Sequence, residues 1–128
     1  MKRLFVIVLS ASVLLGCLAD GISTSQVNIR LSNVSEFDFK NIEVDTGFGR
    51  AGFEDIDAGQ STEYKRFIKA YRYAYIQLEI DGETYTIQPF DYVGETPLKN
   101  GYYTYQIDAN NSKERYGKLM LTLIEDLQ

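Results

Sequence analysis

The sequence of 128 residues has no histidine, no tryptophan and only one cysteine. Without histidine, neither a Ser-His-Asp triad nor a Cys-His pair can be assembled from the chain. Zinc and copper sites normally draw on several His and Cys ligands, so the sequence predicts no site for either metal. A single cysteine permits no disulfide inside the monomer, and the fold must therefore be stabilised by packing alone.

Cations are also scarce, since 13 Lys and Arg stand against 18 Asp and Glu and give a formal net charge of −5. Nucleic-acid binding needs Lys and Arg clustered on one face, so this balance argues against such a partner. The chain contains no internal repeat, no low-complexity tract and no helical hydrophobic period of useful length. Its length suits one domain with its own core.

The longest hydrophobic run lies at the start of the chain. Lys2 and Arg3 precede residues 4–15, which are apolar apart from two serines. The run is too short to span a bilayer comfortably, but it has the length of the hydrophobic region of a signal peptide. It ends in Leu14-Leu15-Gly16-Cys17, which resembles the lipobox of bacterial lipoproteins, a leucine and a small residue leading to a cysteine.

This resemblance implies that the Cys17 thiol is linked to diacylglycerol, that residues 1–16 are removed as a signal peptide, and that the new amino terminus is acylated. Several acyl chains make a stable membrane anchor, whereas one chain gives only marginal binding. Residues 17–26 would then form a flexible tether. Leu18 stands where an aspartate would signal retention at the inner membrane, so the resemblance favours the outer membrane. The alternative is an ordinary secretory signal with an incidental cysteine.

The rest of the chain has the alternating pattern of β-strands. In residues 27–31, Val27, Ile29 and Leu31 share one face, and a change of parity within residues 37–44 predicts a bulge near Lys40 or Asn41. Further strands are expected over residues 53–56, 61–67, 102–109 and 118–126. We expect Tyr64 to be buried, both faces of the last strand to be covered, and the glycine-dense residues 47–52 to form a loop. Residues 68–72 fit either a loop or a turn of helix.

The strongest local signal is a hairpin within residues 73–90, where Asp81-Gly82 separates two alternating runs. Such a dipeptide predicts a two-residue type I′ turn. The turn fixes the register, which pairs Leu78 with Tyr85 and Ile76 with Ile87. These side chains then share one face, while Tyr73, Tyr75 and the polar residues of both runs lie on the other.

About seven short strands separated by turns predict an all-β fold, a single two-sheet antiparallel sandwich over residues 27–128. Leu98 to Tyr103 has the Leu-x-x-Gly-x-Tyr pattern that leads into a late strand of immunoglobulin-like domains. By that resemblance Tyr103 would form a tyrosine corner, in which its hydroxyl bonds to the backbone near Leu98. The paired cysteines and the tryptophan of true immunoglobulin domains are absent.

The ten tyrosines are the most suggestive candidates for binding. Tyr71, Tyr73 and Tyr75 alternate outward, and Phe90 and Tyr102 are candidates to join them. Exposed aromatic rings suit protein or glycan recognition because they offer contact area at small entropic cost. Two alternatives stay open: the face is covered by the second sheet or by residues 47–52, or the rings only stabilise the sheet by cross-strand pairing.

Acidic residues offer two weaker hypotheses. Asp55 opens a stretch similar to the start of a calcium loop, but Gln60 and Arg66 occupy the positions where an EF-hand needs Gly and Glu, so a plain turn is expected. Asp91 and Glu95 lie in the long connection of residues 89–101. These two carboxylates are the candidate pair for glycosidase-like chemistry.

Together these observations predict a lipid-anchored bacterial envelope protein with no cofactor and no catalytic activity. We expect it to act as a binding or structural module with a protein or glycan partner. The alternative is a carboxylate-dependent hydrolase of envelope polysaccharide.

Overall fold

Two four-stranded sheets form the fold in the computed structural model, which describes residues 26–89 and 95–127. The first sheet has the order β4-β1-β7-β8 and contains β1 (Val27–Asn33), β4 (Lys65–Phe67), β7 (Gly101–Ala109) and β8 (Leu119–Leu127). The second has the order β3-β2-β5-β6 and contains β2 (Lys40–Asp45), β3 (Arg50–Phe53), β5 (Tyr75–Ile80) and β6 (Glu83–Ile87). The predicted all-β sandwich is confirmed, with eight strands rather than about seven.

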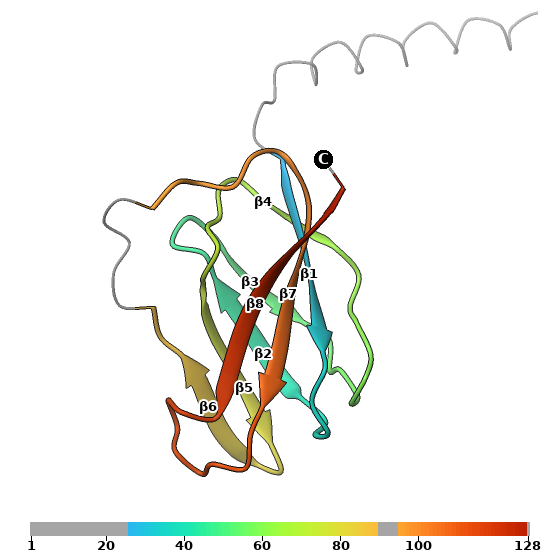
Figure 1. Ribbon diagram of the computed structural model, residues 1–128, viewed down its shortest axis with the longest axis vertical. Helices are drawn as coiled ribbons and strands as arrows, with labels where there is room; N and C mark the ends of the chain where they lie inside the picture. Colours follow the sequence, from blue (N-terminus) through green and yellow to red (C-terminus); the bar gives the residue numbers. More distant parts are fainter. Residues whose placement is uncertain (1–25, 90–94, 128) are drawn as a thin grey trace, which may run out of the picture.

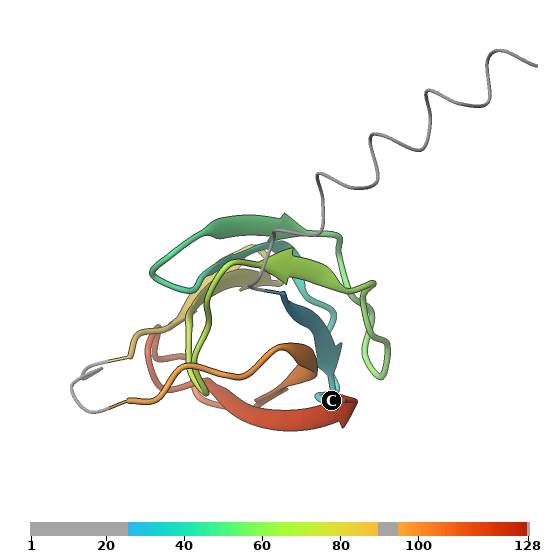
Figure 2. The same ribbon diagram turned by 90° about the horizontal axis from the view of Figure 1, so that it is seen from above.

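The core lies between the two sheets, and the strands surround it when the molecule is seen from above (Figure 2). Strict alternation produces this core: in β1 every second residue is buried, and β5 follows the same pattern. Each aliphatic side chain removed from water in this way stabilises the fold by about 1.5–3 kcal/mol before entropic costs. The completely buried aliphatic and aromatic side chains include Ile29, Leu31, Phe39, Val44, Ile76, Leu78, Tyr105 and Ile107.

One strand pairing departs from the predicted antiparallel sandwich. β1 pairs with β7 in parallel over seven positions, from Val27 opposite Gly101 to Asn33 opposite Ile107. The remaining pairings of both sheets are antiparallel. Parallel neighbours need a long connection, and here the chain passes through the whole second sheet between the two strands. Figure 1 shows β1 and β7 side by side in the first sheet.

Two local predictions for the second sheet are confirmed: the β5–β6 hairpin and the bulge in β2. β5 and β6 pair with Leu78 opposite Tyr85 and Ile76 opposite Ile87, as the turn chemistry requires. Asp81 and Gly82 both have positive φ, +51° and +82°, which is the type I′ conformation. The register of β2 against β5 shifts between Lys40 and Glu43, and Asn41 there has φ of +51°.

Other sequence-based expectations are wrong. Residues 47–52 are not one loop, because a tight turn ends at Gly49 and β3 begins at Arg50. Tyr64 is half-buried and lies outside the core, and Thr62 and Phe67 are the buried members of their segment. Residues 68–72 form a loop, which is one of the two alternatives that the sequence left open.

The outer face of β8 is also not covered as expected. Met120 and Ile124 on that face are 61% and 40% exposed. Both faces of β8 carry apolar side chains. The sequence pattern therefore could not reveal that only one of these faces is packed.

Candidate functional site

The outer face of the second sheet brings polar and aromatic side chains from three strands together. Strand register places Arg50 of β3, Asp45 of β2 and Tyr75 of β5 in one row across the sheet. The next row contains Glu43 and Gln77. We call these five residues the polar face. The alternate residues of the same strands point inward and are buried, so this side of the sheet faces away from the core.

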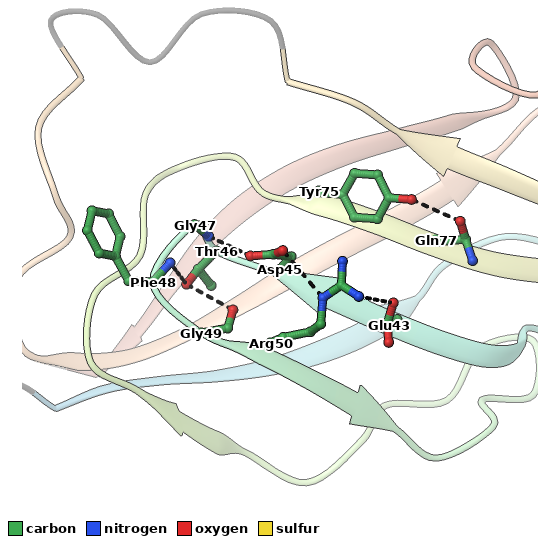
Figure 3. A network of polar contacts seen from close by, with 9 residues as sticks. All are labelled: Glu43, Asp45, Thr46, Gly47, Phe48, Gly49, Arg50, Tyr75 and Gln77. Carbon is green, nitrogen blue, oxygen red and sulfur yellow. Dashed lines mark hydrogen bonds and ion pairs between the residues drawn. The ribbon is translucent and has the colours of Figure 1, made fainter.

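Arg50 lies between two carboxylates on the polar face. Its Nη1 is 3.2 Å from Oε1 of Glu43, and its Nε is 3.4 Å from Oδ2 of Asp45 (Figure 3). All three side chains are partly exposed, Arg50 to 58%. Exposed ion pairs of this kind contribute about 0–1 kcal/mol to stability. These charged groups are therefore free to exchange their contacts with each other for contacts with a ligand.

Tyr75 is held in a defined orientation beside them. Its hydroxyl donates a hydrogen bond of 2.9 Å to Oε1 of Gln77 (Figure 3), and Arg115 Nη2 donates to the same oxygen at 3.2 Å. Arg115 comes from the loop before β8, and its Nε also bonds to the hydroxyl oxygen of Thr86 at 3.2 Å. The half-buried Tyr75 ring is therefore oriented by the hydrogen bond from its hydroxyl to Gln77, a side chain that Arg115 also binds.

A shallow groove of about 240 Å³ runs along the edge of the polar face and is lined by Asp45, Gly47, Arg50, Tyr75, Gln88 and Pro89. Its wall is the turn between β2 and β3. Asp45 Oδ1 accepts a 2.8 Å bond from the Gly47 N–H, and Thr46 N–H donates to the Gly49 carbonyl at 3.0 Å. Gly47 has φ of +92°, a backbone conformation that residues other than glycine rarely adopt.

The structure does not bring the predicted tyrosines onto one surface. Of the predicted binding residues it describes, only Tyr75 lies on the polar face. Tyr73, 48% exposed, lies beside Leu121 and Leu123 of β8. Tyr102 belongs to the other sheet, and its ring meets Tyr64 edge to face with centroids 5.1 Å apart.

Tyr71 is half-buried near Phe48, with their ring centroids 6.2 Å apart. Phe90 lies outside the described residues, so its predicted place beside the other rings stays a prediction. The first sheet packs on the opposite side of the second sheet from the polar face, so it does not cover Tyr75.

The structural predictions for the hairpin and the tyrosine corner are confirmed. Asp81 and Gly82 form the turn described above, and the Tyr103 hydroxyl donates a 2.8 Å hydrogen bond to the carbonyl oxygen of Lys99. Lys99 is adjacent to Leu98, where the resemblance predicted the partner. Tyr103 itself is buried in the core at 2% exposure.

A second cluster, on the outer face of the first sheet, was not found from the sequence. Asp126 Oδ2 accepts hydrogen bonds from the hydroxyls of Tyr64 at 2.9 Å and Thr104 at 2.6 Å. Arg30 Nε donates to the Thr104 hydroxyl oxygen at 2.9 Å, and the guanidinium lies 5.1 Å from the centre of the Tyr64 ring. Burial raises the pKa of the Tyr64 hydroxyl, the Asp126 carboxylate raises it further, and the Arg30 charge acts in the opposite direction.

A third cluster surrounds the ammonium of Lys118, a residue only 5% exposed. Its Nζ donates to the carbonyls of Asn110 and Ser112 at 2.8 and 3.0 Å and lies 4.5 Å from the ring centre of Phe37 and 5.1 Å from that of Tyr85. A groove of about 490 Å³ opens beside it. These hydrogen bonds hold the loop before β8 against that strand, so the role of Lys118 is structural.

The proposed carboxylate pair is not assembled by the part of the chain that the structure describes. Asp91 lies outside it, as does Cys17. Glu95 lines a groove of about 560 Å³ together with Glu125 and Arg72. The hydrolase therefore stays an untested prediction. Within residues 26–89 and 95–127, no group of three or more potential ligands that could hold a metal ion is found. The same residues include no helix long and apolar enough to cross a membrane.

Comparisons with known proteins define the fold and no more. No protein-family model matches the sequence, and no curated protein matches it. Among solved structures, the NMR structure of a protein from Eubacterium rectale is similar, with a TM-score of 0.50 and 16% identity. The match covers 83% of this chain and 91% of that one. At this identity the similarity shows a shared two-sheet β architecture.

Proposed function

We propose that the protein is a lipid-anchored, non-catalytic binding module of the bacterial envelope, and that a glycan binds to its polar face. The observation that carries this proposal is the half-buried ring of Tyr75, which is hydrogen-bonded to Gln77 and lies in the same row as the Arg50–Asp45 pair, on the side of the second sheet that faces away from the core.

The chemistry of the polar face favours a glycan over a protein. A sugar ring presents an apolar face that stacks on an aromatic ring and a rim of hydroxyls that both donate and accept. Tyr75 supplies the ring, Arg50 supplies donors, and Asp45 and Glu43 supply acceptors. Protein interfaces instead have a central core depleted of charges and built on apolar anchors. The polar face has three charged side chains and a single aromatic one.

Co-sedimentation with purified envelope polysaccharide tests the binding. Wild-type protein is incubated with peptidoglycan sacculi and, separately, with lipopolysaccharide. We expect Tyr75→Ala and Arg50→Ala to weaken binding about tenfold or more, since each removes more than about 1.4 kcal/mol of contact. Tyr102→Ala is the matched control, because it removes an exposed tyrosine from the other sheet. Unchanged binding by Tyr75→Ala, or an equal loss in Tyr102→Ala, would exclude the polar face as the site.

Metabolic labelling with a fatty-acid analogue tests the anchor. We expect label on the wild-type protein and none on Cys17→Ser, with the uncut precursor accumulating in the mutant. Mass spectrometry of the mature amino terminus gives the second readout. A bare Cys17 thiol, or a chain that retains residues 1–16, would refute the anchor while leaving the glycan proposal to be judged on its own experiment.

A further inference from the structure

Four cations lie close together in the sequence at one end of the domain. Residues 65–72 contain Lys65, Arg66, Lys69 and Arg72, four of the 13 Lys and Arg of a chain with net charge −5. Within the described residues, Lys65, Arg66 and Lys69 form no ion pair. No carboxylate of the described residues therefore lies within ion-pair distance of these three cations.

This end of the domain is also where the chain enters the fold. Phe67 pairs with Val27, the first residue of β1, so Ile68 lies just beyond the start of that strand. Lys99 belongs to the same end, because Asn100 Oδ1 accepts a 3.0 Å bond from the Gln26 N–H. Figure 1 shows β4 and the start of β1 at this end, with the β5–β6 turn at the opposite end.

Exposed apolar side chains are interleaved with these cations. Ile68 is 69% exposed, the highest value of any large hydrophobic residue in the described part of the chain, and Phe48 is 50% exposed. The Nζ of Lys69 lies 4.7 Å from the centre of the Phe48 ring. We call Phe48, Lys65, Arg66, Ile68 and Lys69 the basic tip. Cations beside exposed apolar side chains are typical of protein surfaces that lie in a membrane interface.

The charge is distributed unevenly along the molecule. Arg72 and Lys99 share a groove with Glu95 and Glu125, so these cations contribute little net charge. At the far end, Asp81 and Glu83 line the groove beside Phe37 together with Lys113 and Lys118, and Glu36 and Asp38 flank Phe37 in the sequence. The cations of the basic tip thus differ from those of these two grooves, which lie beside carboxylates.

We propose that the basic tip docks on the anionic headgroups of the membrane that holds the Cys17 lipid. This inference rests on the proposed lipid anchor. Residues 17–26 number ten, so they can separate the lipid from the fold by at most about 35 Å. A tether this short holds the tip at a millimolar effective concentration near the surface. Even a weak electrostatic contact is then occupied, and the end that carries the β5–β6 turn points away from the bilayer.

Tryptophan fluorescence tests the docking, because the chain has no tryptophan of its own. The full-length protein is purified from membranes as Ile68→Trp and reconstituted into vesicles that contain phosphatidylglycerol or only phosphatidylcholine. We expect a blue-shifted emission, quenched by lipids brominated on their acyl chains, in the anionic vesicles alone. The shift should be lost in 1 M salt, where the Debye length is about 3 Å. The matched control is Tyr116→Trp, in the exposed loop at the far end.

A charge variant gives a second, independent readout. Lys65→Glu combined with Arg66→Glu and Lys69→Glu should abolish the quenching at Ile68→Trp, whereas Lys113→Glu at the far end should not change it. Circular dichroism verifies that each variant is folded.

The outcomes separate this inference from the anchor. Acylated, vesicle-bound protein that shows no quenching at Ile68→Trp, or equal quenching at Tyr116→Trp, refutes the docking and leaves the anchor intact. Equal quenching in phosphatidylcholine vesicles also refutes it. A blue shift without lipid indicates that a second copy covers the tip and refutes it as well. If Cys17 carries no acyl chain, the anchor fails and the docking fails with it.

Discussion

The hydroxyl of Tyr105, in the middle of β7, donates a hydrogen bond of 2.7 Å to the backbone carbonyl oxygen of Tyr71. Tyr105 is completely buried, and Tyr71 belongs to the segment that crosses from β4 in the first sheet to β5 in the second. The bond therefore fastens this crossover to the core. It also gives Tyr71, a predicted binding residue, a structural role through its backbone.

Removing this hydroxyl should destabilise the fold. We expect Tyr105→Phe to lower the free energy of unfolding by about 1–2 kcal/mol, because the Tyr71 carbonyl loses a buried donor. Urea denaturation measures the change. In the control, Tyr75→Phe, a hydroxyl at the half-exposed polar face is removed, and the expected change is within about 0.5 kcal/mol. Equal losses in the two variants would contradict the role assigned to the Tyr105 bond.

Asn33 is completely buried, with 0% exposure, and its side chain is hydrogen-bonded to three other residues. Its amide nitrogen donates to the carbonyls of Phe37 and Ile56 at 2.7 and 3.1 Å, and its side-chain oxygen accepts from the backbone N–H and the hydroxyl of Ser35 at 3.0 and 2.7 Å. We expect Asn33→Ala to lower the free energy of unfolding by about 2–4 kcal/mol, measured by denaturant titration. The exposed Asn111→Ala should change it by less than about 0.5 kcal/mol. A mild effect at Asn33 would show that water replaces these bonds.

Tyr64 should ionise at higher pH than an ordinary tyrosine, because burial and Asp126 raise its pKa. We expect Asp126→Asn to lower that pKa toward the usual value of about 10, as followed by NMR of labelled tyrosine side chains with Tyr64→Phe for assignment. Glu125→Gln is the matched control and should leave the pKa of Tyr64 unchanged. A pKa of Tyr64 that does not move in Asp126→Asn would exclude the carboxylate as a cause.

The same shift makes stability depend on pH in the alkaline range. The pKa of Tyr64 is higher in the folded state, so the unfolded state loses its proton first. The associated stabilisation is complete below the unfolded pKa of about 10 and is lost as pH rises through the folded value. Wild-type protein should therefore lose more stability above pH 10 than Tyr64→Phe, compared by urea denaturation across that range.

The glycines of the second sheet should differ in their tolerance of a side chain. Gly82, at φ of +82°, occupies the left-handed region, and Gly82→Ala should lower the free energy of unfolding by about 1–2 kcal/mol. In Gly52→Ala the new Cβ would meet nothing closer than the Ile42 carbonyl oxygen at 3.8 Å, an ordinary contact. This control should be neutral within about 0.5 kcal/mol in thermal unfolding. A tolerated Gly82→Ala would mean that the turn relaxes to another type.

The candidate site was only partly predictable. Tyr75 was assigned outward from the hairpin register, and the structure confirms that orientation. The sequence does not predict its neighbours Arg50 and Asp45, because the second strand of their hairpin has the glycine-dense composition of a loop. A signal was present: the alternation of Ile42 and Val44 leads into a turn at Gly47, and a paired strand is the usual continuation after such a turn.

The sequence by itself determined the features that depend on neighbours in the chain. These are the buried faces of β1 and β5, the type I′ turn at Asp81 and Gly82, and the inward Tyr103, since alternation and turn conformation are local properties. Only the tertiary structure decided the parallel pairing of β1 with β7, the separation of Tyr75 from Tyr102 onto different sheets, and the basic tip around Ile68. These arrangements join segments far apart in sequence, and which strands become neighbours is set by the packing of the whole core.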